Sequence, residues 1–193
     1  MENQLKAWLS DYLETYSKTI KKLTADSVLP IISEFASTCK NQKNIFVFGN
    51  GGSAANASHF VNDLAKGVAV ETGINIKAIS LNENVSLMTA ISNDCSYEDV
   101  YLMQLANLAN SGDLVFTLSV SGNSPNLIKA VEWANKNGLN TIAIVGGKKG
   151  KLYELAKQSV VIDSFHYGHV EDIHLFICHL IGYALMENQE LLK

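Results

Sequence analysis

Two loops rich in glycine and serine carry residue types that can bind a phosphate group. The first, Gly49–Ser53, and the second, Ser119–Ser124, each follow a short apolar run and precede a helical pattern. A strand, a tight turn and a helix N-terminus therefore come in succession, twice. Free backbone N–H groups and the helix dipole both favour an anion at such a place. Two such loops in one small chain predict a site for a phosphorylated small molecule.

The second loop is the more specific of the two. Ser119, Ser121 and Ser124 offer hydroxyl groups in close succession, and Pro125 stands where the first turn of a helix tolerates proline. The lysine-containing motif of nucleoside-triphosphate sites is absent. The first loop also fits the looser dinucleotide pattern G-x-G-x-x-A, but the expected acidic residue after the next strand is missing. A phosphate monoester is therefore favoured over a nucleotide, with an ordinary turn as the alternative for each loop.

The helical pattern after the first loop carries a candidate acid–base pair. His59 and Asp63 are four residues apart, which places both on one face of a helix. The last helical pattern adds Glu171 and His179, which are two turns apart and on about the same face. Imidazole and carboxylate groups serve both proton transfer and binding of zinc. The sequence leaves open whether these groups converge or are ordinary polar groups on helix surfaces.

Composition excludes several other classes of protein. The chain has 193 residues, of which 47% are hydrophobic and 18% charged, and a net charge of −4. This balance predicts no general attraction to nucleic acid or to an anionic membrane. No apolar run approaches the roughly 18 residues that span a bilayer, and the first residues lack the apolar stretch of a signal peptide. Three widely spaced cysteines without a C-x-x-C pair are typical of reduced thiols, so we expect a cytoplasmic protein.

Strand-like and helical patterns alternate through most of the chain. Two amphipathic helices are expected first, at about residues 8–20 and 26–39. The expected strands are 45–48, 74–79, 114–118, 141–145 and 160–162, and the expected helices among and after them are 54–66, 85–91, 97–110, 127–137, 152–157 and 170–187. Such alternation predicts a parallel sheet. Ligands bind at the carboxyl ends of the strands in such sheets, so both loops can face one crevice.

The order of these pieces resembles the sugar isomerase (SIS) domain family and, within it, the phosphoheptose isomerase group. The segments that carry the resemblance are 49–55, 59–60, 84–85, 89–91, 93–94, 98–101, 112–113 and 119–125. The resemblance runs over nearly the whole chain. It implies one SIS domain over residues 1–193, with an N-terminal helical segment at 1–43 and an α/β core with a C-terminal helix at 44–193. The implied fold is a three-layer α/β/α sandwich with a five-stranded parallel sheet plus N-terminal helices.

The resemblance also implies an activity. The group interconverts sedoheptulose 7-phosphate and D-glycero-D-manno-heptose 7-phosphate, an aldose–ketose isomerisation that leads toward the heptoses of bacterial lipopolysaccharide or capsule. It implies a homotetramer with active sites between subunits, and one zinc ion per subunit in some members. Neither a nucleotide cofactor nor a nucleic acid or membrane partner is expected.

Residue by residue, the resemblance gives each group a role. We expect Asp63 to be the base and His179 the acid of an enediol mechanism, with His59, Asp63, Glu171 and His179 as the ligands of a zinc ion. The expected substrate-binding residues are Asn50, Gly51, Gly52, Ser53, Asn93, Asp94, Gln104, Ser119, Ser121 and Ser124.

Three departures from the family pattern bear on the substrate. Asp63 stands where the family usually has a longer glutamate, Glu171 stands where it has glutamine, and residues 167–172 differ from the usual entry to the last helix. The alternatives are an isomerase of a different ketose or aldose phosphate for surface glycan synthesis, or a non-catalytic SIS protein that binds a protein partner, such as a replication initiator. The retained His59, carboxylate at 63 and His179 favour an enzyme.

Overall fold

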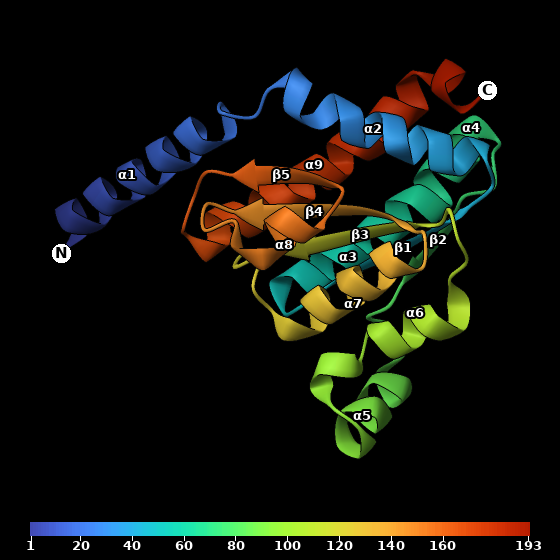
Figure 1. Cartoon of the computed structure of the whole chain (residues 1–193). Coiled ribbons are helices and arrows are strands. Elements are labelled where there is room, and N and C mark those ends of the chain that lie inside the picture. Colours follow the sequence, from blue (N-terminus) through green and yellow to red (C-terminus); the bar gives the residue numbers. More distant parts are fainter.

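A five-stranded parallel sheet forms the centre of the protein, as the computed structural model, which describes residues 1–193, shows (Figure 1). Its strands lie in the order β2-β1-β3-β4-β5, and all neighbours are parallel. Their bounds are β1 Asn44–Gly49, β2 Lys77–Ser80, β3 Leu114–Ser119, β4 Asn140–Gly146 and β5 Gln158–Ile162. The chain changes direction across the sheet between β1 and β3, and a crevice at such a switch point is where open α/β sheets bind ligands. Both candidate phosphate loops follow these two strands.

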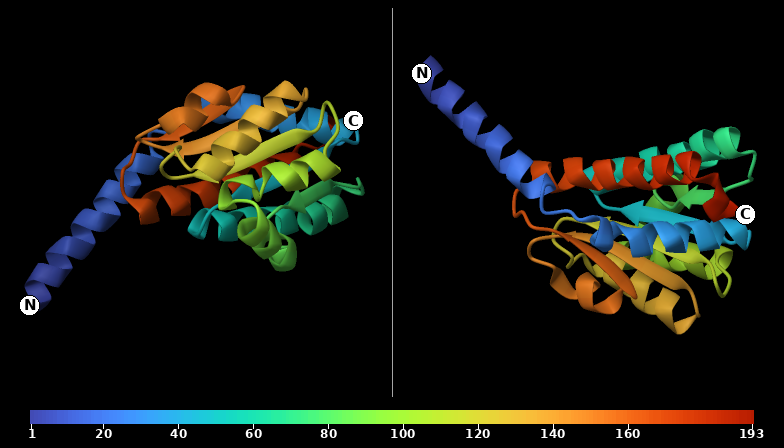
Figure 2. Two further views of the ribbon diagram at one scale, coloured as in Figure 1. Left: turned by 60° about the horizontal axis from the view of Figure 1, so that its bottom comes forward. Right: turned by 90° about the horizontal axis from the view of Figure 1, so that it is seen from above.

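Helices cover both faces of the sheet. The α-helices are α1 Glu2–Ile20, α2 Ala25–Lys40, α3 Gly52–Asn62, α4 Ala69–Thr72, α5 Val85–Asp94, α6 Leu102–Leu108, α7 Pro125–Lys136, α8 Gly150–Leu155 and α9 Tyr167–Glu187. A π-helix, η1, spans Asp63–Val68, and two short 3₁₀ helices, η2 and η3, span Tyr97–Asp99 and Gln189–Leu192. In the view from above, the helices form one layer on each side of the sheet (Figure 2, right).

Alternation along the strands builds two separate cores. On β1, Ile45 and Val47 point into the core under α2, α3 and α9, while Phe46 and Phe48 point into the core under α6, α7 and α8. All four side chains are fully buried, as expected of a parallel sheet covered on both faces. The three-layer α/β/α sandwich with N-terminal helices is therefore confirmed.

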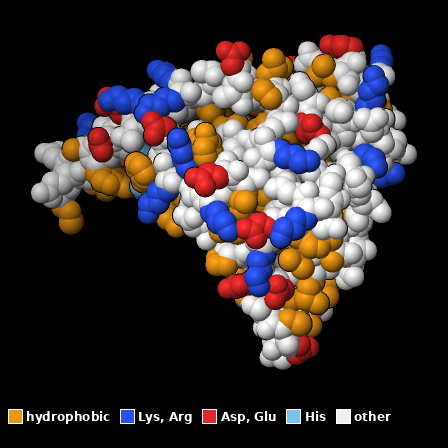
Figure 3. All heavy atoms as spheres, in the orientation of Figure 1, with side chains coloured by type: hydrophobic (Ala, Val, Ile, Leu, Met, Phe, Trp, Pro, Cys, Tyr) orange, Lys and Arg blue, Asp and Glu red, His pale blue; other side chains and the backbone are white.

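Two elements project from this body. Helix α1 extends as a straight arm at the left of Figure 1, and α5 protrudes at the bottom of the same view; Figure 2 shows the arm from two further directions. Exposed hydrophobic side chains, among them Leu5, Leu9 and Leu13, follow one side of the arm (Figure 3). On the face shown in Figure 3, basic and acidic groups are interspersed rather than gathered into a patch of one sign.

Four expected elements differ in the structure. The first helix, expected from about residue 8, begins at Glu2. The expected strand 74–79 begins only at Lys77, because Lys77 is the residue opposite Asn44, where β1 starts. The expected helix 97–110 is divided into η2 and α6, because the Ser96 side chain caps a short first turn by accepting a hydrogen bond from the Glu98 N–H. The expected helix 54–66 continues through η1 and α4 to Thr72.

All three cysteines are free thiols, with Cys39 and Cys178 buried and Cys95 exposed. Among the helices, none combines the length and the apolar character needed to cross a bilayer.

Candidate active site

The two glycine- and serine-rich loops line a single hollow of about 400 Å³. Its lining residues are Asn50, Gly51, Gly52, Ser53, Ser119, Val120, Ser121, Ser124, Tyr167 and Glu171. The structure therefore brings both loops to one crevice, as the sequence predicts, and adds the first turn of α9 as a third wall. Because α3 and α7 both begin at this hollow, two helix N-termini favour an anion there.

Glycine is required at two positions of the first loop. Gly51 has φ +56° and ψ −125°, a conformation that residues with a side chain rarely adopt. A Cβ on Gly49 would lie 2.8 Å from the Cβ of Ser53 and 2.9 Å from the carbonyl oxygen of Leu118. These glycines let the end of β1 approach both β3 and the first turn of α3.

The serines of the second loop have different tasks. The hydroxyl oxygen of Ser119 accepts a hydrogen bond from the Gly122 N–H at 3.1 Å, and that of Ser121 accepts one from the Asn123 N–H at 3.2 Å. Ser124 occupies the N-cap position of α7 but makes no side-chain capping bond. Two serines thus shape the loop, and the third keeps its hydroxyl free for a ligand.

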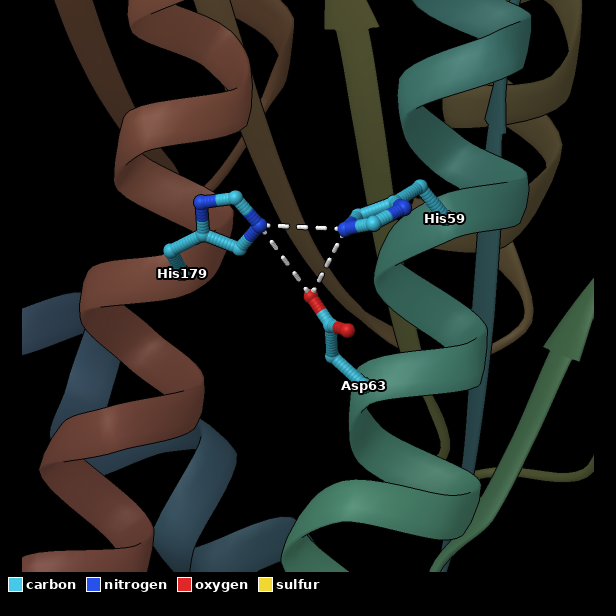
Figure 4. Close-up of side chains that lie close together, drawn as sticks. All are labelled: His59, Asp63 and His179. Atoms are coloured by element: carbon cyan, nitrogen blue, oxygen red, sulfur yellow. Dashed lines mark hydrogen bonds and ion pairs between the residues drawn. The ribbon is translucent and has the colours of Figure 1, made fainter.

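A cluster of three chemical groups lies between α3 and α9 (Figure 4). The Nε2 atoms of His59 and His179 are 3.0 Å apart, and the Oδ2 atom of Asp63 lies 3.4 Å from the first and 3.6 Å from the second. This Oδ2 atom is buried and has no hydrogen-bond partner. The structure therefore brings together three of the four residues expected to serve proton transfer or metal binding.

The donor atoms of this cluster fit a zinc ion. Four ligands at about 2.0–2.1 Å from zinc in a tetrahedron are separated from one another by about 3.3 Å. The three separations here, 3.0, 3.4 and 3.6 Å, lie around that value. Two imidazoles and one carboxylate are also a ligand set typical of catalytic zinc, with a position left for water or substrate.

The shorter carboxylate at Asp63 reaches both imidazoles. Asp63 is the C-cap residue of α3 and has α-helical dihedral angles, and its backbone N–H donates to the carbonyl of His59 one turn earlier. The π-helix η1 begins at this residue, and π-helical turns are frequent at functional sites. From this position the aspartate lies 3.4 and 3.6 Å from the two imidazoles without the extra methylene of a glutamate.

Glu171 lies apart from the three-residue cluster. It precedes His179 by eight residues on α9, and this separates the two along the helix by about 12 Å. Its carboxylate rests on Gly52 instead: a Cβ there would lie 2.5 Å from both carboxylate oxygens. Its backbone carbonyl accepts a hydrogen bond from Asn56 at 2.8 Å. Within one chain, the expected fourth ligand therefore belongs to the phosphate hollow.

Three other expected substrate-binding residues lie outside the hollow. Gln104 is buried, and its side-chain amide donates hydrogen bonds to the backbone carbonyls of Leu81 and Val100. Asn93 and Asp94 are exposed near the end of the projecting α5, where the Asn93 amide donates to the Asp94 carboxylate at 2.8 Å. In a single chain, Gln104 has a structural role and the other two do not reach the loops.

Sequence reasoning missed the support of the first loop. Asn50 lines the hollow, but its side-chain amide is bonded to Asn126 and to the hydroxyls of Tyr97 and Tyr101. Tyr167, which starts α9, is a further lining residue. Amide and phenol groups distributed over distant segments have no spacing pattern, so only the fold reveals them.

Burial makes one thiol near the cluster inert. Cys178 precedes His179 and is fully buried, and its burial raises the pKa of the thiol, with a smaller contribution from the charge of Asp63. A thiol held in its protonated form is a poor nucleophile. The chemistry of this region is therefore left to the imidazoles and the carboxylate.

Comparison with known proteins gives the family. The sequence profile of the SIS domain family matches residues 8–146. A probable phosphoheptose isomerase of Thermoplasma volcanium is 36% identical over 173 residues, which cover 90% of this chain and 88% of that protein. A phosphoheptose isomerase of Helicobacter pylori is 35% identical over 144 residues, covering 75% of this chain and 74% of that protein.

Solved structures agree with this assignment. The phosphoheptose isomerase of Neisseria gonorrhoeae superposes with a TM-score of 0.85 and 25% identity over 96% of this chain and 98% of that one. The fold is also that of a phosphoheptose isomerase from Francisella tularensis, with a TM-score of 0.84, 23% identity and coverage of 96% and 97%. The chain belongs to the SIS domain family, in its phosphoheptose isomerase group.

Proposed function

We propose that this protein is an aldose–ketose isomerase that interconverts sedoheptulose 7-phosphate and D-glycero-D-manno-heptose 7-phosphate. The observation that carries the proposal is the position of the His59, Asp63 and His179 cluster on the two helices whose first turns border the phosphate hollow. Relatives named phosphoheptose isomerase, 36% and 35% identical to the chain, support the same reaction.

The separation between hollow and cluster suits a seven-carbon substrate. His59 lies six residues beyond Ser53 on α3, a rise of ~9 Å. An extended chain advances roughly 1.2 Å per bond, so the seven bonds from phosphorus to C2 of sedoheptulose 7-phosphate span about 8 Å. A five-carbon sugar phosphate has two bonds fewer and spans only about 6 Å, which matches the rise less well. With its phosphate in the hollow, the heptose thus presents its carbonyl carbon at the cluster.

The reaction needs one base and one acid. Asp63 takes a proton from C1 of the ketose, and the carbonyl oxygen at C2 receives a proton from Nε2 of His179, which yields an enediol. His179 then removes the proton of the C1 hydroxyl, and Asp63 returns its own proton to C2, which yields the aldose. The unpaired Oδ2 of Asp63 suits this role, since no hydrogen bond has to be broken first.

We also propose that this cluster binds a zinc ion through His59, Asp63 and His179, and that the ion would then take the place of the Nε2 proton of His179, because a metal-bound ring nitrogen carries no proton. Zinc at this position would polarise the carbonyl group as a Lewis acid. The support is the fit of the three donor separations and the unpaired, buried Oδ2 atom of Asp63.

We propose, further, that the active site is completed by other copies of the chain in a homotetramer. The side chains of His59 and His179 are 47% and 43% exposed in a single chain, although an enediol has to be protected from water. Two exposed apolar side chains, Tyr183 on α9 and Val70 on α4, line the cavity beside Asp63 and His179. The free state of all three cysteines suits the reducing cytoplasm, where we place the protein.

Turnover by the purified protein tests the proposal. We expect isomerisation of sedoheptulose 7-phosphate in D₂O to incorporate deuterium on carbon, and a chelator to slow it until zinc is restored. Asp63→Asn should lower kcat by about 10²–10⁴-fold, the usual contribution of a positioned base. Asp26→Asn, an exposed carboxylate of α2, should have no effect.

Other outcomes separate the alternatives. Turnover of another ketose or aldose phosphate but not of sedoheptulose 7-phosphate would show that the substrate is assigned wrongly. Full activity of Asp63→Asn would contradict the mechanism. A lack of turnover across a panel of sugar phosphates, with retained phosphate binding, would favour the non-catalytic alternative.

A further inference from the structure

The structure assigns a positioning role to Tyr101, Asn82 and Asn126, which together hold the first phosphate loop in its binding conformation. This inference rests on one part of the proposed function, the binding of phosphate by the first loop. None of the three residues lines the phosphate hollow itself. They act through Gly49 and Asn50, the first two residues of the loop, of which Gly49 is also the last residue of β1.

Asn82 extends the sheet with its side chain. After β2 ends, the backbone N–H of Leu81 still donates to the carbonyl of Val47 at 3.1 Å. The amide of Asn82 then serves Gly49 as a backbone partner would: its Oδ1 accepts from the Gly49 N–H at 3.3 Å and its Nδ2 donates to the Gly49 carbonyl at 2.9 Å. Both backbone groups of the last strand residue are thereby satisfied where the β1–β2 ladder has ended.

Tyr101 also bonds to Gly49, through its hydroxyl group. Its hydroxyl lies 2.5 Å from the Gly49 carbonyl and 3.0 Å from Oδ1 of Asn50, and it accepts a hydrogen bond from Asn82 at 2.8 Å. The ring is fully buried and stacks on Phe48 with a centroid separation of 4.7 Å. Burial raises the pKa of Tyr101 to about 12, so the hydroxyl keeps the proton that it donates.

Asn126 joins the two loops to each other. It is the second residue of α7, directly after the serine loop, and is 1% exposed. Its amide and that of Asn50 form a reciprocal pair, each Nδ2 donating to the other Oδ1 at 2.9 Å. Its Oδ1 also accepts from the Leu127 N–H at 3.0 Å. A displacement of one loop is therefore transmitted to the other.

The amide of Asn50 is consequently occupied by the protein. Its Oδ1 has three donors within reach, from Tyr97, Tyr101 and Asn126, and an amide oxygen has only two lone pairs. Two of these donors are buried, whereas Tyr97 is half exposed. A ligand in the hollow thus meets the N–H groups and hydroxyl of the next loop residues rather than Asn50. Accurate placement of those donors determines how tightly phosphate binds.

Tyr101→Phe tests the inference, because it removes one hydroxyl and keeps the ring. We expect the Kd for inorganic phosphate and the KM for the sugar phosphate to rise about tenfold, with kcat changed less than threefold. Amide hydrogen exchange of residues 49–53 should accelerate. Asn126→Ala, which removes the amide pair with Asn50 and adds no charge, should act in the same direction and is a second variant should Tyr101→Phe fold poorly.

Thr117→Val is the matched control. Its hydroxyl is equally buried and donates to the carbonyl of Phe48 on β1, one residue before Gly49. We expect a loss of stability similar to that of Tyr101→Phe but unchanged phosphate binding and loop exchange. Unchanged binding and loop exchange in Tyr101→Phe and Asn126→Ala would overturn the positioning role. Faster loop exchange in a protein that turns over no sugar phosphate would instead leave the positioning role intact and contradict the proposed function.

Discussion

A substitution that is conservative in charge still changes the length of the side chain. Asp63 stands where the family usually has a longer carboxylate, and its Oδ2 nevertheless lies 3.4 and 3.6 Å from the two imidazoles. The charge at this position was evident from the sequence, but its reach was not, because the distance to His179 depends on how closely α9 packs against α3 (Figure 4).

Glu171 differs from the family in charge, because a glutamate stands where the family has the uncharged glutamine. Its carboxylate rests on Gly52 in the same hollow that offers two helix N-termini to phosphate. Its spacing in the sequence places Glu171 on the same face of the helix as His179, but two helical turns separate the two residues, so Glu171 does not join the His59, Asp63 and His179 cluster. Like charges a few ångströms apart repel strongly where water is partly excluded.

Glu171→Gln should therefore strengthen phosphate binding. We expect the Kd for inorganic phosphate to fall about tenfold at pH 7.5, equivalent to roughly 1.4 kcal/mol, because the amide keeps the shape of the side chain and removes its charge. Calorimetric titration at low and high salt measures the effect, which should shrink as salt screens it. Glu187→Gln, at the other end of α9, is the control. Weaker binding by Glu171→Gln would show that the carboxylate assists the ligand.

At the scale of elements, the periodicity of the chain located nearly every strand and helix. Alternating apolar residues and glycine loops are local signals, and they suffice for a doubly covered parallel sheet. The start of β2 at Lys77 depends on its partner Asn44, and the division of residues 97–110 depends on a cap at Ser96. Features that depend on a partner elsewhere in the chain carry no local signal in the sequence. The hydrogen bonds by which Asn82, Tyr101 and Asn126 hold the first phosphate loop are another example.

Helix α9 contains a histidine that serves the fold rather than the site. His174 faces the sheet and is fully buried, and burial lowers its pKa to about 3, far below the usual 6.5. Between these two pH values the unfolded chain binds a proton there that the folded chain does not. Folding stability must then fall as the pH falls, by about 1.4 kcal/mol per pH unit, whereas above pH 6.5 this group contributes nothing.

His174→Leu should remove part of this acid sensitivity. On lowering the pH from 7.5 to 5, the unchanged protein should lose about 2 kcal/mol more of its free energy of unfolding than the His174→Leu variant loses. Urea denaturation at the two pH values measures the change, and other titrating groups cancel in the difference. Ile173→Val shortens a neighbouring buried side chain of α9 that carries no titratable group, so it should lower stability by the same amount at both pH values. An equal pH response in the two variants would refute the role of His174.

At the scale of the molecule, single-chain geometry leaves the site open on one side. A cavity of about 580 Å³ adjoins the cluster, with Asp63 and His179 in its wall and Tyr183 and Val70 at its edge. Asp94, expected near the sugar, instead lies on the projecting α5 (Figure 1). An exposed apolar surface beside the His59, Asp63 and His179 cluster and the exposed apolar side chains along α1 both favour assembly.

Disruption of this face should therefore weaken assembly and catalysis together. We expect the protein to behave as a tetramer in light scattering, and Tyr183→Glu to yield smaller species with kcat lowered more than tenfold, because a charge is then buried in the interface and the cluster is left open to water. Leu108→Glu, at an exposed site at the end of α6 on the other side of the sheet, should change neither property. A monomer with full activity would show that one chain completes the site by itself. High protein concentration favours assembly by mass action. If the Tyr183→Glu variant recovers its activity at high concentration, the substitution acts by weakening assembly and not by damaging the cluster.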